Sequence, residues 1–357
     1  MPSRSCLRLL SACLCLLLLG ACGEGPLVRQ ESYVFGTRVE VLTFGTPEPE
    51  AQAAISTVLR EFDRLYRTLH AWQPSPLTEL NTALARGEQL QVSAEMAGLL
   101  TVSQDFAQRS DGLFDPAIGG LIELWGFHSD TYVPRLPAPA DLQTWLAAHP
   151  GMQDVHIEGL TVSSANRAVR IDLGGIAKGY ALDRAATLLR EAGIRNALIN
   201  IGGNIMALGA KGKQHWSVGI QDPRGSGALA SLALYDGEAI GTSGDYQRFF
   251  EVDGQRYSHL LDPRTARPAT HTQAVTVLIP SRENAGLLSD VVSKPLFLAA
   301  GGWPAMARRL ELRDVLRVDD TGHIQLTPDL RQRLRWTKDI PAATIIDPFS
   351  SASAPAS

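Results

Sequence analysis

The stretch AVRIDLGGIAKGYALDRAATLLREAG, residues 168–193, contains the junction on which the predicted fold depends. A strand near 168–172 passes into a helix over 176–192, which ends at Gly193. Patterns outside this stretch predict strands over 32–44, 155–162, 196–201, 215–220, 229–235 and 273–280. They also predict helices over 51–69, 94–109 (with Ser93 as N-cap) and 282–300. Between these elements we expect a surface excursion over 134–150 and hairpin turns at Asp253-Gly254 and at Asp320 to Gly322. Because hairpins are frequent and no regular βαβ alternation occurs, the pattern predicts an α+β fold.

The same junction also has the features of an anion site. Gly174 and Gly175 let backbone N–H groups approach an anion closely, and a helix start together with Lys178 favours negative charge. The stretch is not a Walker A loop, because Gly follows Lys178, and it has no G-x-G-x-x-G fingerprint. It therefore indicates either an anion site or a tight strand-to-helix turn with a solvated lysine.

The composition excludes several classes of protein. The 357 residues are 45% hydrophobic and 20% charged, which allows a large core and excludes a disordered or collagen-like chain. The net charge of −4 leaves no basic excess to neutralise a phosphate backbone, so no nucleic acid partner is expected. The four cysteines all lie between Cys6 and Cys22, which excludes a disulfide framework or a Cys-ligated metal site from the body of the protein.

The N-terminus has the pattern of a bacterial lipoprotein. Basic residues precede an apolar run that is too short to span a bilayer, and Leu19-Gly20-Ala21-Cys22 follows it like a lipobox. We predict a signal peptide over 1–21, a lipidated Cys22 with a tether over 22–31, a main domain over 32–337 and a disordered tail over 338–357. An ordinary secretory signal, in which Cys22 has no role, is the alternative.

Further polar segments follow apolar strands or lie on a predicted helix. Asn200 to Asn204 contains paired glycines and reads as a β-bulge when taken alone. Asp290 and Lys294 are four residues apart on a helix, which by itself predicts an ion pair. Candidate site groups at strand ends are Thr242, Ser243, His259 and Asp262. No paired histidine spacing suggests zinc, and no G-x-S-x-G elbow is present.

Taken in order behind the lipobox, these segments resemble the ApbE family of flavin transferases, over roughly residues 32–302. The resemblance is carried by FGT at 35–37, HAWQPSPLTELN at 70–81, DGLFDPAIGGLIELWGF at 111–127, IDLGGIAKGYALD at 171–183, NIGGNI at 200–205, IGTSGDY at 240–246, HLLDPRT at 259–265 and DVVSKPLF at 290–297. Each segment alone is weak, and the ordered set is specific.

The resemblance implies an activity and a fold. Family enzymes cleave FAD at the pyrophosphate, attach FMN through a phosphoester bond to a Thr or Ser in a D-x-x-[ST]-G-A-[ST] motif of a target protein, and release AMP. It also implies a T-fold-like duplicated core with antiparallel sheets and packed helices. Two alternatives stay open: an FAD pyrophosphatase that yields FMN and AMP, and a non-catalytic FAD-binding lipoprotein.

The resemblance further implies a set of site residues. His259 is the candidate for the general base or for phosphate positioning. Phe35 stands where the family commonly has Met near the flavin, and Ala266 replaces a usual Gly, which requires a backbone that avoids positive φ. The expected FAD contacts are Phe35, Trp72, Ala117, Ile118, Gly119, Asp172, Lys178 and Leu261.

A Mg²⁺ ion is implied as well, held by the carbonyl of Gly175, by Asp290 and by a Thr one turn later. Lys294 stands at that Thr position, and an ammonium group cannot coordinate a cation. Three consequences are open: Lys294 places its own charge on the pyrophosphate, Ser293 ligates after a shift helped by Pro295 at the helix start, or metal-dependent transfer is lost.

A lipid anchor and such a target together predict a location. We expect the chain in the bacterial cell envelope, facing the periplasm, with extracytoplasmic redox proteins such as subunits of ion-pumping flavin complexes as targets. Gly23 after the lipidated cysteine favours the outer membrane, and an inner-membrane anchor remains open.

Overall fold

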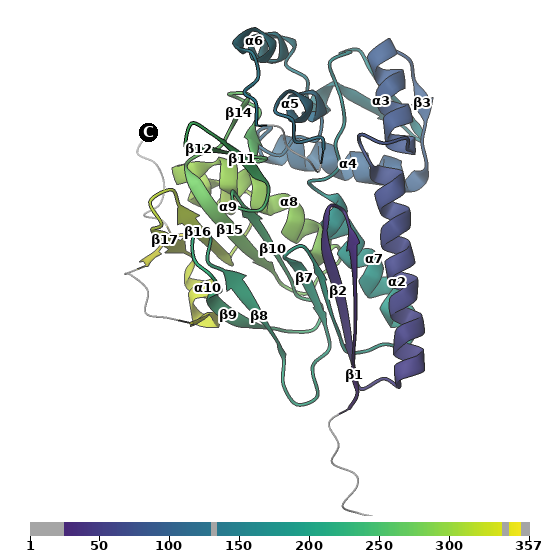
Figure 1. The fold of residues 1–357 in the computed structure, drawn as a ribbon, viewed down its shortest axis with the longest axis vertical. Helices are drawn as coiled ribbons and strands as arrows, with labels where there is room; N and C mark the ends of the chain where they lie inside the picture. The colour runs from purple at the N-terminus through teal and green to yellow at the C-terminus, as the bar shows by residue number, and fades with distance from the viewer. Residues whose placement is uncertain (1–24, 130–133, 338–342, 351–357) are drawn as a thin grey trace, which may run out of the picture.

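A nine-stranded sheet forms the centre of the computed structural model, which describes residues 25–129, 134–337 and 343–350. The strand order is β1-β2-β6-β7-β10-β15-β16-β17-β19, and neighbours are antiparallel except β17 and β19 (Figure 1). The strands are β1 (Leu27–Val34), β2 (Thr37–Phe44), β6 (Ala197–Ile201), β7 (Asn204–Leu208), β10 (Ala239–Gly244), β15 (Thr272–Ile279), β16 (Val315–Asp319), β17 (Ile324–Leu326) and β19 (Thr344–Ile345). The combination of this sheet with packed helices confirms the predicted α+β class.

The sheet consists of two successive units with the same ββααββ order. The helices are α2 (Glu48–Leu69) and α7 (Ala177–Glu191) in the first unit, and α8 (Ala285–Leu298) and α9 (Trp303–Arg309) in the second. The first unit is thus β1, β2, α2, α7, β6 and β7, and the second is β10, β15, α8, α9, β16 and β17. A short pairing between β7 and β10 joins them into one sheet. This order confirms the duplicated core that the resemblance implies.

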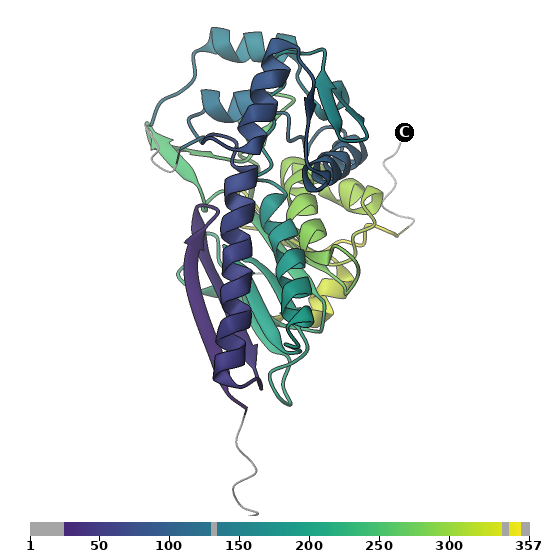
Figure 2. The same ribbon diagram turned by 90° about the vertical axis from the view of Figure 1, so that its right-hand side faces the viewer.

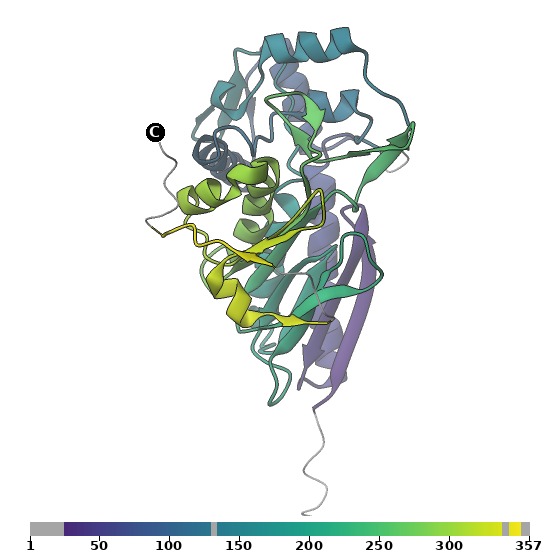
Figure 3. The same cartoon turned by 90° about the vertical axis from the view of Figure 1, so that its left-hand side faces the viewer.

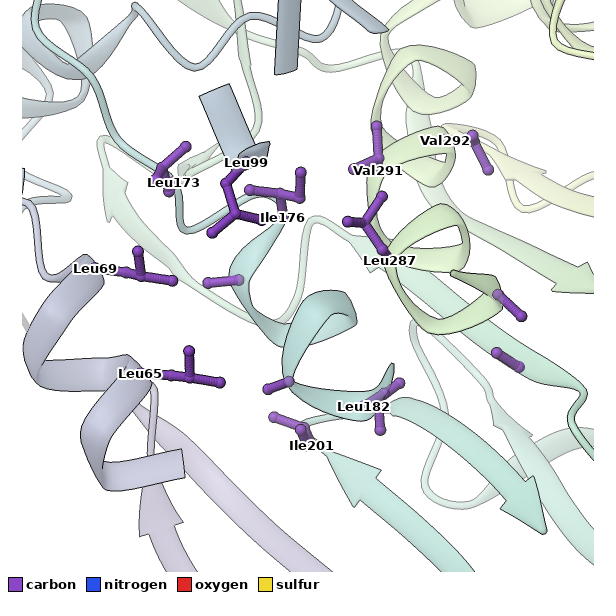
Figure 4. Close-up of a cluster of buried hydrophobic side chains, with 14 of the residues drawn as sticks. Leu65, Leu69, Leu99, Leu173, Ile176, Leu182, Ile201, Leu287, Val291 and Val292 are labelled. Carbon is purple, nitrogen blue, oxygen red and sulfur yellow. The ribbon is translucent and has the colours of Figure 1, made fainter. Parts of the chain in front are cut away.

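One face of the sheet is covered by α2, α7 and α8. Figure 2 shows α2 running along the β1–β2 hairpin with α7 beside it. Leu65 and Leu69 of α2, Leu182 of α7 and Leu287 and Val291 of α8 point into a common core, as Figure 4 shows. A fully buried leucine contributes about 2 kcal/mol relative to an exposed one, so this layer supplies much of the stability.

A smaller sheet covers part of the opposite face. Its order is β18-β9-β8, with β8 (Trp216–Gln221), β9 (Ala228–Leu234) and β18 (Arg335–Trp336). Figure 3 shows these strands and α10 (Pro328–Arg333) against the central sheet. Trp216, Leu232 and Leu326 belong to the second hydrophobic core, between the two layers.

Two insertions lie at one end of the duplicated core. The first, between α2 and α7, holds α3 (Pro76–Arg86), β3 (Leu90–Gln91), α4 (Ala94–Arg109), α5 (Gly119–Leu124), α6 (Pro139–Ala148), η1 (Met152–Asp154), β4 (Val155–Glu158) and β5 (Thr161–Ser164). The second, between β10 and β15, holds β11 (Phe249–Val252), β12 (Gln255–Ser258), β13 (Leu261–Asp262) and β14 (Arg267–Pro268). They meet in a stack of aromatic rings that includes Trp125, Phe250 and Tyr257. A last short helical turn, η2, spans Ala300–Gly302.

Elements with local signals were predicted well. Helix α4 spans Ala94–Arg109, and the side chain of Ser93 accepts the N–H of Met96 as its N-cap. Helix α7 is followed at Gly193 by a φ of +78°. Asp253 and Gly254 form the tight turn of β11–β12, both with positive φ, as a type I′ turn requires.

Four predictions inside the chain need correction. The strand over 32–44 is the hairpin β1–β2, whose turn residues Phe35 and Gly36 have φ of +57° and +66°. The segment 168–172 forms no strand: only Arg170 makes a bridge, to Ile118. The other two are the strand over 155–162, which is the hairpin of β4 and β5, and the β-bulge at Asn200 to Asn204, which is the two-residue turn between β6 and β7.

Both predicted ends of the main domain also need correction. β1 begins at Leu27, so much of the expected tether over 22–31 is strand. Within the expected disordered tail over 338–357, β19 pairs in parallel with β17. The predicted signal peptide over 1–21 and the predicted lipidation site Cys22 lie outside the described residues. Among the described helices, none combines the length and apolar character needed to cross a bilayer.

Candidate active site

A cavity of about 920 Å³ opens where the two insertions meet the duplicated core. This volume lies at the upper end of the range for small-molecule sites, about 300–1,000 Å³. Aromatic side chains and three cations line it together: Phe35, Tyr66, Trp72, Phe114, Phe127, Tyr246, Lys178, Arg248 and Lys294. The cavity therefore suits a large ligand that has both a flat apolar part and negative charge.

The aromatic part of the wall is held in place by polar contacts. The indole N–H of Trp72 donates to Asp172 Oδ2 at 3.2 Å, and the guanidinium of Arg170 lies 4.3 Å from the centre of the Trp72 ring. Arg170 also pairs with Glu123 of α5. The ring of Phe35 packs edge-on against Tyr66 at 5.9 Å. These contacts fix the orientation of the rings before a ligand binds.

The predicted anion site lies at the start of α7. Asp172 Oδ1 accepts the N–H of Gly174 at 2.7 Å, which tightens the turn, and α7 begins at Ala177 without a side-chain cap. Gly174, Gly175 and Lys178 line the cavity. An uncapped helix N-terminus with a lysine in its first turn attracts an anion. Of the two interpretations of this stretch, the geometry favours the anion site.

A buried carboxylate, Asp290, lies directly behind Lys178 and Lys294. Lys294 Nζ is 2.5 Å from Asp290 Oδ1, and Lys178 Nζ is 4.0 Å from the same oxygen. Burial alone raises the pKa of Asp290, but the two ammonium groups outweigh it and hold the pKa below its ordinary value. Asp290 is therefore an anion that positions two cations at the cavity wall.

The close crossing of α7 and α8 produces this arrangement. A Cβ on Gly179 would lie 2.5 Å from the carbonyl oxygen of Gly286, and a Cβ on Gly286 would lie 2.7 Å from that of Gly179. Because both residues lack a side chain, the N–H of Gly179 reaches Asp290 Oδ2 at 2.9 Å. Asp183 of α7 accepts the N–H groups of Gly286 and Leu287 at 2.8 Å each, which caps α8.

Burial of Asp183 raises its pKa to about 6, although the two backbone N–H bonds oppose this shift. The pKa of an unfolded Asp is about 3.9. Between about pH 4 and 6, Asp183 is therefore protonated in the folded chain and ionised in the unfolded chain. This group's contribution to stability is thus largest below about pH 4 and is lost as the pH rises through 6. We expect the unfolding free energy of the wild type to rise relative to that of Asp183→Asn as the pH falls from 7 to 5. Urea titrations at both pH values measure this; a difference that does not change with pH contradicts it.

His259 lines the cavity beside these cations. Its Nδ1 lies 3.1 Å from the carbonyl oxygen of Arg248, so Nδ1 carries the hydrogen and donates. Burial, and then the charges of Arg248 and Lys178, lower the pKa of His259 to about 3. The imidazole is therefore neutral at pH 7, with an unprotonated Nε2.

Most of the candidate residues lie together at this cavity. Those that line it are Phe35, Trp72, Ile118, Asp172, Gly175, Lys178, His259, Leu261 and Lys294. Ala117 and Gly119 differ from the expectation: they lie outside the lining and support it. The N–H of Ala117 donates to Asp115, and the N–H of Gly119 to the carbonyl of Arg170. Thr242 and Ser243 lie within β10, where Thr242 pairs with Thr276.

The prediction for Ala266 is wrong, because its φ is +55°. The residue is buried, and its carbonyl accepts the indole N–H of Trp125 at 2.9 Å. That hydrogen bond and the surrounding apolar cluster hold Ala266 in a left-handed conformation that costs about 1–2 kcal/mol.

Several lining residues were not predicted from the sequence, among them Gln221, Gln247 and Arg248. Gln247 and Arg248 directly follow the IGTSGDY segment, at the start of the predicted hairpin, and that adjacency is the signal that could have found them. Gln221 comes from the end of β8, and no pattern in the sequence connects it to the other segments.

The residues do not fit the implied Mg²⁺ ion. Asp290 Oδ1 holds the ammonium of Lys294 and Oδ2 holds the N–H of Gly179. Ser293 cannot replace the missing Thr: its buried hydroxyl bonds to Ser243 and to the carbonyl of Asp290, and Pro295 lies inside α8 rather than at its start. No cluster of three or more His, Cys, Asp or Glu suited to a metal occurs among the described residues.

The duplicated α+β core and the cationic, aromatic cavity define a class of protein whose site suits a large aromatic anion, such as a nucleotide cofactor. The model of the ApbE family matches residues 35–315, and the chain belongs to this family.

Relatives and solved structures agree with this assignment. The chain is 44% identical over 310 residues to an FAD:protein FMN transferase of Rhodobacter capsulatus, covering 87% of this chain and 58% of that relative. It is 33% identical over 293 residues to the enzyme of the same name from Treponema pallidum (strain Nichols), covering 76% and 80%. The ApbE protein of Thermotoga maritima superposes with a TM-score of 0.79 at 30% identity, covering 87% of this chain and 100% of that one. The flavin transferase ApbE of Vibrio cholerae does so with a TM-score of 0.76 at 25% identity, covering 87% and 99%.

Proposed function

We propose that this chain is an FAD:protein FMN transferase. The observation that carries the proposal is the cavity itself, in which an oriented aromatic wall, the N-terminus of α7, two lysines and a neutral histidine meet. Membership of the ApbE family and the activity for which its relatives are named support the same function.

Two parts of FAD match the two kinds of wall. The isoalloxazine ring is flat and largely apolar, and Phe35, Tyr66 and Trp72 offer it aromatic faces and edges. The pyrophosphate carries negative charge, and Lys178, Lys294 and the start of α7 neutralise it. FAD is thereby held with its phosphates on the side of the cavity that contains His259.

The transfer step uses His259 as the base. The hydroxyl oxygen of the target Thr or Ser attacks the phosphorus on the FMN side, and its proton passes to Nε2 of His259. A new P–O bond forms, the bond from that phosphorus to the bridging oxygen breaks, and AMP leaves with that oxygen. Such a reaction depends mainly on positioning and on neutralising charge, which the lysines and the helix N-terminus supply.

The location and the target are part of the proposal. The lipobox at Cys22 supports a lipid anchor in the bacterial envelope, facing the periplasm, on the outer or inner membrane. The target is a redox protein on that side that carries a D-x-x-[ST]-G-A-[ST] motif. A membrane-anchored transferase meets such targets where they are exposed.

A labelling assay tests the function. The full chain is incubated with FAD and a protein carrying D-x-x-T-G-A-T, once with Mg²⁺ and once with EDTA, and flavin fluorescence is read on a denaturing gel. We expect a fluorescent target band with AMP released in proportion, and no band when the target Thr is changed to Ala. Release of free FMN and AMP without a labelled band would instead identify an FAD pyrophosphatase. Bound FAD without release of AMP would identify a non-catalytic binding protein. The Treponema pallidum relative on the same target is the positive control.

A further inference from the structure

The position of Lys294 has a consequence for the chemistry of the proposed transfer. Its ammonium donates to both Asp290 Oδ1, at 2.5 Å, and the carbonyl oxygen of Asp290, at 2.8 Å. A Cβ on Gly175 would lie 3.3 Å from Lys294 Cε, so the lysine stem packs over the glycine turn. The ammonium therefore occupies the Asp290 oxygen that was expected to hold a metal, and the lysine stem lies against the glycine turn.

Further observations show that the structure holds the Lys294 ammonium firmly at this position. Only 2% of the Asp290 side chain and 17% of the Lys294 side chain are exposed, so water screens the pair weakly. Lys178, whose Nζ lies 4.0 Å from the same carboxylate oxygen, is the second cation of the cluster. Lys178 and Lys294 both line the cavity, whereas Asp290 does not. A divalent ion at Asp290 would have to displace Lys294 and lie close to Lys178.

We propose that the ammonium of Lys294 takes the place of a divalent cation at Asp290, so that this chain transfers FMN without a bound metal ion. The inference rests on the proposed transferase function. Lys294 and Lys178 neutralise the negative charge that grows on the phosphate oxygens and on the bridging oxygen as AMP departs. Atoms and charge balance as in the step above, since an ammonium supplies charge without entering any bond that forms or breaks.

The first test uses the wild-type chain and needs no variant. We expect target labelling in EDTA to proceed at nearly the rate seen with Mg²⁺, and we expect no stoichiometric Mn²⁺ binding in the absence of FAD, as measured by electron paramagnetic resonance. Complete loss of labelling in EDTA with rescue by Mg²⁺, or binding of about one Mn²⁺ per chain that Asp290→Asn abolishes, overturns the inference.

Two variants of Lys294 sharpen the result. Lys294→Met removes the charge and should lower the transfer rate by about 10²- to 10³-fold, the cost of losing one charge-stabilising group. Lys294→Thr frees Asp290 Oδ1 and adds a hydroxyl oxygen, so it should gain a Mn²⁺ site and become dependent on Mg²⁺. A structural role alone would not create that dependence, and a Lys294→Thr chain that folds but binds no Mn²⁺ contradicts the inference. Lys213→Met, at an exposed loop lysine, is the matched control.

The outcomes separate the two proposals. If no target band forms with Mg²⁺ or with EDTA while the positive control labels the target, the transferase function fails. The Mn²⁺ measurement still decides the metal question in that case, because it needs no turnover. If the band forms only with Mg²⁺, the transferase function stands and the metal-free reaction fails.

Discussion

Changing His259 to Gln should lower the rate of FMN transfer by about 10²- to 10⁴-fold while FAD affinity stays close to that of the wild type. Glutamine has a similar length and can keep a hydrogen bond to the carbonyl of Arg248, which His259 Nδ1 makes at 3.1 Å. It cannot accept a proton as Nε2 does. The measurement is the initial rate of target labelling at saturating FAD, together with an equilibrium titration of FAD.

The pH dependence of the wild type adds a second readout. Burial and the nearby cations lower the pKa of His259 to about 3, so the imidazole stays neutral, with Nε2 unprotonated, down to about pH 4. We expect no loss of labelling that follows an ordinary histidine titration near pH 6.5. His215→Gln, at an exposed histidine that packs on Tyr235, is the matched control and should leave the rate unchanged.

The control experiments also distinguish the two roles considered for His259. If FAD affinity falls as much as the transfer rate in His259→Gln, the histidine positions phosphate and is not the base. If neither changes, the residue has no part in the reaction and the proposed mechanism is wrong.

Local signals in the sequence were sufficient for much of the fold. Ser93 and the Asp253-Gly254 turn were predicted correctly because each depends on contacts within a few residues. The Phe35-Gly36 turn was missed because Phe rarely adopts positive φ; the pairing of β1 with β2 and the contact of Phe35 with Tyr66 hold it there. Segment 168–172 was predicted as a strand, although its backbone bonds instead to Pro116 and to Gly119 at the start of α5, both distant in sequence.

The site shows the same division between local and distant causes. The ion pair of Asp290 and Lys294 follows from their spacing on one helix, and the structure has it. The approach of Lys178 to the same carboxylate requires α7 and α8 to cross closely, and no spacing in the sequence reports on that. Gly179 and Gly286 permit the crossing, but in the sequence each is only a glycine within a helix.

Gly179→Ala should therefore destabilise the fold, whereas the same change at Gly98 should stabilise it. Both residues lie inside helices, α7 and α4, and replacing a helical Gly by Ala normally gains about 0.5–1 kcal/mol. A Cβ at Gly179 would lie 2.5 Å from the carbonyl oxygen of Gly286 and 2.7 Å from Leu287 Cα, which are backbone atoms that cannot rotate away. A Cβ at Gly98 would meet nothing within 4 Å.

Forcing the helices apart costs about 1–3 kcal/mol or more, which exceeds the gain in helix propensity. It also lengthens the bond from the Gly179 N–H to Asp290, so the carboxylate that positions Lys178 and Lys294 shifts. Urea unfolding of Gly179→Ala should show lower stability together with slower FMN transfer, while Gly98→Ala should be more stable and transfer at the wild-type rate. Equal shifts in stability for the two variants would mean that the crossing of α7 and α8 does not depend on the missing side chains, and the account of how the site is assembled would be wrong.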